Sequence, residues 1–305
     1  MRTADVIALA SEHLRGLRGH EFDVLEVTKP VSPAAAINLA KIISKLSPLV
    51  GNLSEFNTCE YLNELPEFDG WGRWQRQDPG FPDTVFLGRV APTPGFEIKA
   101  WFPLATEITA RFKDSQNHFA DNNTYVAMLA WLPEFLIFGK PHIVDIVVVS
   151  AASVAKARDD HYHNPPDYLV IEPNDTAART VNLQQTNTAG YKFQGTPAQF
   201  AAAQELVASW GNNGSFYSPT HDYQARLAEL MARFPYRLDT NFAKMDRIGH
   251  PDIEAFKRRT YRSSFKGRTI LEWKQLLSRG GEAAVALTLA DTFGIHDSND
   301  ESVVE

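Results

Sequence analysis

Two carboxylates and one ammonium occur at a spacing that could hold a metal ion beside a water nucleophile. Asp83 follows Pro82 at the head of one apolar run. Glu97 and Lys99 lie two positions apart in a second run, residues 96–102. In an extended strand such positions share a face and are roughly 7 Å apart. Because Mg²⁺ prefers oxygen ligands, Asp83 and Glu97 could bind it together with a phosphate oxygen. Lys99 could orient or deprotonate an attacking water, or stabilise the transition state.

The elements that must bring these groups together are two neighbouring strands. The sequence between them, LGRVAPTPG at residues 87–95, contains the Gly and Pro residues that mark turns. With Ala91 at the centre of this loop, antiparallel pairing places Asp83 opposite Lys99. The alternation in the second run predicts one buried face, made of Phe96, Ile98, Ala100 and Phe102.

With Pro82-Asp83 and Glu97-Ile98-Lys99 as its motif, the chain resembles the PD-(D/E)XK nuclease superfamily. Its layout is most similar to that of type II restriction endonucleases. The resemblance implies an α/β fold, a restriction-endonuclease-like core with a central mixed β-sheet flanked by helices. A mostly helical C-terminal half would follow this core.

The resemblance also implies the reaction. A type II restriction endonuclease hydrolyses phosphodiester bonds of double-stranded DNA at a specific short sequence and leaves 5′-phosphate ends. The implied cofactor is Mg²⁺, for which Mn²⁺ can substitute. Asp83 and Glu97 would be catalytic metal ligands, and Lys99 would be the third catalytic residue.

The same resemblance implies a cytoplasmic protein of a bacterial or archaeal cell. It would act as a homodimer, since a palindromic site matches two-fold protein symmetry, beside a separate cognate DNA methyltransferase. Two alternatives remain open. One is a non-sequence-specific or repair-type nuclease with the same core. The other is a non-catalytic α/β protein that binds DNA or another ligand, in which the same three residues form a structural ion-pair network.

A second match to the motif tests how specific the pattern is. Pro251-Asp252 is followed by Glu272-Trp273-Lys274. The apolar residues around it recur at helical spacing, which predicts a helix over residues 269–279. Positions two apart on a helix point about 200° away from each other, so Glu272 and Lys274 cannot face one metal ion.

A helix is predicted over residues 33–64, with Ser32 as its N-cap and a break at Ser47-Pro48. Its predicted apolar stripe consists of Ile42, Leu46, Leu49, Leu53 and Phe56. Glu55 lies just off this stripe. Many restriction enzymes have a Glu at the comparable place, so the resemblance implies that Glu55 is a third catalytic, metal-binding carboxylate. A solvated helix acid is the alternative.

Composition limits the class of protein. The chain has 305 residues, of which 44% are hydrophobic and 22% charged, enough for a full core. No apolar run approaches the roughly 20 residues of a membrane span, and no leader peptide is expected. A single cysteine, Cys59, precludes an internal disulfide. The absence of a GxxxxGK[ST] loop argues against an ATP-driven motor.

DNA contacts are expected in three segments, although the net charge is −7. Phosphate affinity comes from Lys and Arg, which crowd residues 255–279. The residues expected to contact phosphates there are Arg258, Arg259, Arg262 and Lys266. A polar loop after Trp101 supplies Arg111, Lys113 and Asn117 as further backbone contacts. An amide-rich segment, residues 179–194, offers Gln184, Gln185, Asn187 and Lys192 for base edges, or is an ordinary polar loop.

The remaining pattern is mixed and favours an α/β core. Helices are predicted at residues 4–17, 196–210, 220–234, 251–261, 269–279 and 281–292, and strands at 125–132, 142–149 and 168–172. The predicted division is a nuclease core at 1–195, a helical region at 196–295 that packs on it with a basic DNA-facing surface, and an acidic, disordered tail at 296–305.

A rival metal site would use His161 and His163, which lie beside two aspartates. On a strand the two imidazoles would share a face and could bind zinc. The flanking Asp-Asp and Pro-Pro pairs instead favour a surface loop.

Overall fold

The structure is a computed structural model. It describes residues 1–77, 80–105, 119, 121–163, 191–193, 195–211, 221–238, 245 and 248–296. The chain divides into two compact units. One comprises Met1–Ala110, Asp121–Ala151 and Pro251–Glu305, and the other comprises Arg111–Ala120 and Ala152–His250.

A five-stranded mixed sheet forms the centre of the first unit. Its strands are β1 (Gly72–Arg76), β2 (Thr84–Gly88), β3 (Gly95–Trp101), β4 (Thr124–Pro133) and β5 (Pro141–Ser150), and they lie in that order. β3 and β4 are parallel, and the other neighbours are antiparallel. The α/β class, the mixed sheet and the predicted strands at 125–132 and 142–149 are therefore confirmed.

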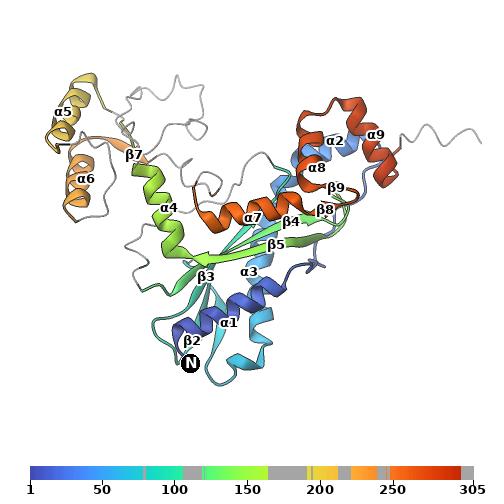
Figure 1. Cartoon of the computed structure of the whole chain (residues 1–305), viewed down its shortest axis with the longest axis horizontal. Helices are drawn as coiled ribbons and strands as arrows, with labels where there is room; N and C mark the ends of the chain where they lie inside the picture. The colour runs from blue at the N-terminus through green and yellow to red at the C-terminus, as the bar shows by residue number, and fades with distance from the viewer. Residues whose placement is uncertain are drawn as a thin grey trace, which may run out of the picture. The chain divides into compact units, whose positions relative to one another are not determined.

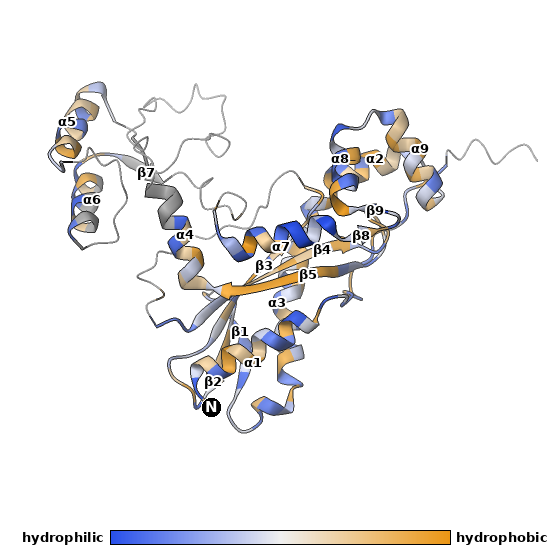
Figure 2. Ribbon diagram, viewed as in Figure 1, coloured by the Kyte–Doolittle hydropathy of each residue, from blue (hydrophilic) through white to orange (hydrophobic). Residues whose placement is uncertain are grey.

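Helices cover both faces of this sheet. The helix α1 (Thr3–Gly16) packs on β5, and α3 (Ser47–Asn63) packs on β1 and β3. The helix α7 (Pro251–Arg262) also contacts β5, and Figure 1 shows it on the side of the strands opposite α1. In Figure 2 β5 is largely hydrophobic, whereas much of α7 is hydrophilic.

An aromatic cluster fixes the α3 side of the sheet. Trp74 on β1 lies opposite Phe86 on β2, and its ring centroid is 5.3 Å from that of Phe96 on β3. At the outer edge of β1, Asn63 Nδ2 donates to the carbonyl of Trp74 at 2.9 Å. The N–H of Trp74 donates to Asn63 Oδ1 at 2.8 Å.

The predicted helix 33–64 forms, with the expected break. It consists of α2 (Pro33–Ile42), a 3₁₀ turn η1 (Ile43–Leu46) and α3. The predicted stripe was wrong: Ile42 is 58%, Leu49 45% and Phe56 53% exposed. The 3₁₀ turn changes the phase of the helix, so α3 instead buries a face of mostly small residues: Ser47, Val50, Ser54, Thr58, Cys59 and Leu62.

The predicted helices at 196–210, 220–234, 269–279 and 281–292 form as α5 (Pro197–Ala208), α6 (His221–Arg233), α8 (Ile270–Arg279) and α9 (Glu282–Phe293). The elements that the sequence did not predict are η2 (Pro66–Phe68), α4 (Ala151–His163), β6 (Tyr191–Phe193), β7 (Tyr236–Leu238), β8 (Ser264–Phe265) and β9 (Arg268–Thr269). The helices α7, α8 and α9 belong to the unit that contains the sheet, whereas the sequence grouped them with residues 196–250.

The predicted strand 168–172 and most of the acidic tail lie outside the described residues. Within the described ranges, no helix combines the length and the apolar character that a membrane span requires.

Candidate active site

The strands β2 and β3 separate early and leave one edge of β3 open. They pair only at Thr84 with Phe96 and at Val85 with Gly95. β3 nevertheless continues to Trp101, paired with β4 on its other side. The result is a fork between the two strands, and α3 packs on β3 beside it.

The register of this hairpin differs from the predicted one. The observed pairs are symmetric about Val90, whereas the prediction placed the centre at Ala91. Continued past the last pair, the register places Asp83 opposite Glu97 instead of Lys99. The loop inside the innermost observed pair, Val85 with Gly95, therefore spans residues 86–94, one position earlier than the predicted loop at 87–95.

Asp83 takes the place of a strand partner at the fork. Its Oδ2 accepts a 2.6 Å hydrogen bond from the N–H of Ile98, a group on the open edge of β3. Gln77 holds the chain at this point, because its N–H donates to the carbonyl of Asp83 at 2.8 Å. Its Nε2 donates to the carbonyl of Pro82 at 2.9 Å. The backbone of Asp83 is thus held on one side and its carboxylate on the other.

The structure brings Asp83, Glu97 and Lys99 together, as the sequence predicted. Lys99 Nζ donates to Glu97 Oε1 and lies 3.8 Å from Asp83 Oδ2. The three side chains are mostly buried, with exposed fractions of 17% for Asp83, 11% for Glu97 and 18% for Lys99. One ammonium therefore lies close to two carboxylates, and all three groups are mostly shielded from solvent.

The charge at this site is incompletely balanced. Burial raises the pKa of Asp83 from 3.8 to about 6; the Lys99 ammonium opposes this shift, and the Glu97 carboxylate adds to it. Glu97 Oε2 is buried and accepts no hydrogen bond from any described residue. Both observations indicate room for a second cation.

The donor chemistry of Asp83 and Glu97 fits Mg²⁺, a hard ion that prefers carboxylate oxygens. Within the described part of the chain, no three or more His, Cys, Asp or Glu side chains gather as a metal-binding group. Mg²⁺ does not require three, because it can use one or two carboxylates, several waters and substrate phosphate oxygens. The two carboxylates are thus the described residues that would hold it.

Glu55 does not join them as a third carboxylate. Arg76 Nε donates to Glu55 Oε2 at 2.9 Å, and Arg76 Nη2 lies 3.4 Å from Asn52 Oδ1. Arg76 lies opposite Thr84 in the sheet, and this register directs it toward α3. Burial raises the pKa of Glu55, the Arg76 hydrogen bond opposes the shift, and the Asp83 charge adds to it. The charge of Asp83 therefore affects the pKa of Glu55, although the Glu55 carboxylate is bound to Arg76.

A cavity of about 300 Å³ lies between α3 and β3 beside these groups. Its lining residues are Ser47, Pro48, Gly51, Asn52, Glu55, Ile98, Lys99 and Ala100. Gly51 on α3 faces Ala100 on β3, and a Cβ at Gly51 would lie 3.9 Å from that of Ala100, which is ordinary van der Waals contact. Glu55 and Lys99 therefore line the same cavity.

Sequence reasoning missed Arg76 and Gln77. Arg76 closes an ion pair with a residue 21 positions away, and Gln77 acts through backbone groups. The signal for Arg76 was the short alternating run GRWQR at residues 72–76, which becomes β1. No local pattern marked Gln77.

The residues predicted to contact DNA are only partly described. Arg258, Arg262 and Lys266 are exposed on α7 and the turn after β8. Arg259 Nε lies 3.2 Å from Asp145 Oδ2 on β5, so this guanidinium also anchors α7 to the sheet. Lys192 lies on β6. The remaining residues lie outside the described ranges: Arg111, Lys113, Asn117, Gln184, Gln185 and Asn187.

The second match to the motif is structural. Glu272 and Lys274 lie on α8, as predicted. Glu272 Oε2 accepts from the N–H of Thr269 at 2.7 Å and caps the helix. Lys274 Nζ donates to the hydroxyl of Tyr261. These groups have roles in helix capping and packing.

The rival zinc pair lies on a helix and not in a loop. His161 and His163 form the end of α4, which corrects the predicted surface loop.

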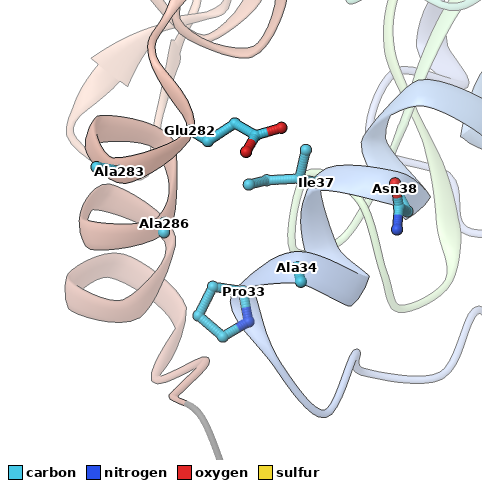
Figure 3. Close-up of a pocket in the computed structure, with 7 residues that line it drawn as sticks. All are labelled: Pro33, Ala34, Ile37, Asn38, Glu282, Ala283 and Ala286. Atoms are coloured by element: carbon cyan, nitrogen blue, oxygen red, sulfur yellow. The ribbon is translucent and has the colours of Figure 1, made fainter.

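A second cavity, of about 360 Å³, lies between α2 and α9 (Figure 3). Pro33, Ala34, Ile37, Ala283 and Ala286 give it an apolar lining. Glu282 is the one ionisable residue among those that line it, so it lacks the paired charges found at the fork.

The fork thus combines opposite charges, burial and an adjoining cavity. No protein family model, no curated protein and no solved structure matches this chain.

Proposed function

We propose that this protein is a Mg²⁺-dependent endodeoxyribonuclease similar to type II restriction endonucleases. It would hydrolyse phosphodiester bonds of double-stranded DNA at a specific short sequence and leave 5′-phosphate ends. The observation that carries the proposal is the meeting of Asp83, Glu97 and Lys99 at the fork between β2 and β3. The mixed sheet with helices on both faces supports a restriction-endonuclease-like core.

Each residue of the site has a distinct task in this proposal. Asp83 and Glu97 hold Mg²⁺, or Mn²⁺ in its place. When bound there, the ion would supply a lowered pKa for a water and compensation for the negative charge on the phosphate. Lys99, a donor in contact with both carboxylates, orients the attacking water or stabilises the negative transition state.

Glu55 supports the site from α3. Its carboxylate keeps Arg76 in place, and it lines the same cavity as Lys99. Glu55 would act as a metal ligand only after it leaves Arg76. We therefore assign it a supporting role in the protein without substrate.

Assembly and cellular setting follow from the proposed reaction. A two-fold homodimer would place one site on each DNA strand. A separate cognate methyltransferase would protect the host DNA, in the cytoplasm of a bacterial or archaeal cell. A nuclease without strict sequence preference would use the same three residues.

One observation favours a second candidate function. Lys99 contacts both carboxylates, as expected of a structural ion pair in a protein that binds DNA or another ligand without cutting it. The unbonded, buried Glu97 Oε2 and the raised pKa of Asp83 weigh against it, since a purely structural network would satisfy these groups.

Incubation of purified protein with supercoiled plasmid and Mg²⁺ tests the proposal. Discrete fragments that EDTA abolishes are expected, and mapping of their ends gives the recognition site. A smear would indicate the non-specific nuclease, and intact plasmid would indicate the non-catalytic protein. Lys274→Ala is the matched control for Lys99→Ala, because it removes a lysine from the helical match to the same motif.

A further inference from the structure

Among the described residues, no helix covers part of the sheet face that carries Glu97 and Lys99. Trp101, on the same face of β3, packs against Phe256 of α7 with ring centroids 5.5 Å apart. The helix therefore covers this face at one end of β3. On β2 the same face is buried at Val85, which is 9% exposed, and accessible at Leu87, which is 49% exposed.

The register of β1 and β2 defines which residues lie on this accessible area. Trp74 and Phe86 point into the aromatic core, so their neighbours point to the opposite face. The pairs on that face are Arg73 with Leu87 and Gln75 with Val85. One further pair follows, because the N–H of Arg89 donates to the carbonyl of Trp71 at 2.8 Å. We call Trp71, Arg73, Gln75, Leu87 and Arg89 the open hairpin face.

The charge on the open hairpin face is positive. Arg73 and Arg89 are exposed, and neither forms an ion pair with a described residue. Asp83 is the one acidic residue that alternation places on the same face of residues 71–77 and 83–89. Two guanidinium groups thus lie on the same hairpin as Asp83, and neither forms an ion pair among the described side chains.

The two arginines lie at defined distances from the fork. Arg73 pairs with Leu87, four residues from Asp83, which is about 13 Å along the strand. Arg89 is six residues from Asp83, or about 20 Å. Phosphates of one DNA strand repeat every 3.4 Å along the helix axis, so these distances correspond to about four and six nucleotide steps.

We propose that the open hairpin face binds the backbone of a DNA duplex, with Arg73 and Arg89 in contact with its phosphates. This inference rests on the proposed function, because it places the duplex over the sheet face that carries the proposed catalytic groups. Arg258 and Arg262 are exposed on α7, the helix that covers the other part of that face. Basic residues therefore flank the fork from two elements.

A second copy of the chain fits this surface less well than DNA does. In a two-fold interface the same patch contacts itself, which brings Arg73 and Arg89 toward their own copies. Apposed like charges are unfavourable unless acids intervene, and this face has only Asp83. A polyanion satisfies both guanidinium groups.

The test measures duplex binding in EDTA, so that cleavage plays no part. The variants are the double substitution Arg73→Gln/Arg89→Gln and, as matched control, Arg18→Gln. Arg18 is an exposed arginine just after α1, the helix that packs on β5 from the side opposite α7. A fluorescent synthetic duplex of mixed sequence is titrated at salt concentrations between about 50 and 200 mM.

Loss of two phosphate contacts should make the slope of log K against log[salt] shallower by about 1.8. At about 0.1 M salt each lost contact should weaken binding roughly eightfold. Arg18→Gln should retain the wild-type slope. Thermal unfolding should be unchanged in all variants, because the substituted side chains are exposed.

Several outcomes separate this inference from the proposed function. A double variant that binds with the wild-type slope, while the wild type cuts DNA, overturns the binding surface alone. A shallower slope without cutting by the wild type in Mg²⁺ supports the surface and overturns the nuclease. A wild type that binds no duplex overturns both. If the double variant keeps the wild-type slope but sediments as a monomer where the wild type sediments as a dimer, the open hairpin face is assigned to contact between copies.

Discussion

The carboxylate of Asp83 receives the backbone N–H of Ile98 at 2.6 Å, where β2 has already left β3. A proposed catalytic side chain thus also completes the hydrogen bonding of a strand. Its removal should therefore affect stability as well as cleavage, and the two effects can be separated.

Asp83→Ala should abolish cleavage and lower the free energy of unfolding by about 1–2 kcal/mol, because the N–H of Ile98 loses its acceptor. Asp83→Asn should also abolish cleavage but retain most of the stability, since its amide oxygen can accept the same bond. Urea denaturation and plasmid cleavage check both. Equal stability of the two variants would contradict the role of Asp83 as a strand partner.

Lys99→Met should abolish cleavage and leave two mostly buried carboxylates without their ammonium. Removal of one partner of such a pair costs up to about 3 kcal/mol. The loss should be larger at pH 8 than at pH 5, because protonation of Asp83 relieves the repulsion. Denaturation at both pH values measures it. An active Lys99→Met enzyme would sink the catalytic assignment.

The pKa of Asp83 predicts how stability varies with pH. Burial raises this pKa from 3.8 to about 6, so the folded protein binds the proton more tightly than the unfolded chain does. The stability that Asp83 contributes is therefore fully present below about pH 3.8 and is lost as the pH rises through 6. Asp83→Asn cannot ionise, so its stability relative to wild type should rise between pH 4 and 7. Parallel curves for the two proteins would exclude the shift.

Activity should have the opposite dependence. Metal binding requires the ionised carboxylate, so cleavage at limiting Mg²⁺ should fall as the pH drops below about 6. Rates measured from pH 5 to 8 at several Mg²⁺ concentrations check this, and excess Mg²⁺ should move the midpoint to lower pH. A midpoint insensitive to Mg²⁺ would point to a group other than a metal ligand.

Arg76→Met should leave Glu55 without its cation beside the cavity. Glu55 is a supporting residue at the cavity that Lys99 also lines, and loss of such an outer hydrogen-bond partner typically lowers activity or metal affinity 10–100-fold. Glu55→Gln should lose less, because it keeps an acceptor for Arg76 and removes the buried charge. A double-mutant cycle on cleavage rate and on Mn²⁺ affinity separates the pair from either residue alone. Additive effects would show that Arg76 does not act through Glu55.

Gly95→Ala should distort the fork. A Cβ at this position would lie 2.4 Å from Pro82 Cγ and 3.0 Å from the carbonyl oxygen of Thr84, so the chain that carries Asp83 must shift. A stability loss of about 1–3 kcal/mol and a large drop in cleavage are expected. Gly51→Ala is the control: its Cβ meets Ala100 at 3.9 Å, and alanine favours the helix by up to about 1 kcal/mol. Normal cleavage by Gly95→Ala would show that the approach of Pro82 is not needed.

Local signals predicted many of the helices and strands correctly. The alternation in residues 96–102 gave β3, and helical spacing together with the capping residues Thr269 and Glu272 gave α8. Both depend on neighbours a few positions apart. For this reason the sequence alone distinguished Lys99 on a strand from Lys274 on a helix.

Non-local geometry was harder to predict. A shift of one position in the centre of the turn moved the partner of Asp83 from Lys99 to Glu97. The ion pair of Arg76 with Glu55 requires the β1–β2 register and the packing of α3, neither of which a short window encodes. The apolar residues of α3 also misled, because the 3₁₀ turn before α3 changes the phase of the helix, so that α3 buries a face of mostly small residues.

The side-chain amide of Asn63 forms hydrogen bonds with both the backbone N–H and the backbone carbonyl of Trp74 on the outermost strand. At the far side of the sheet, Glu21 and Val27 make bridges to His142 and Gly139 next to β5. Another chain that tried to extend the sheet would have to displace these contacts first. Self-association through continuous β-pairing, including amyloid-like stacking of the folded form, is thereby discouraged at these two positions.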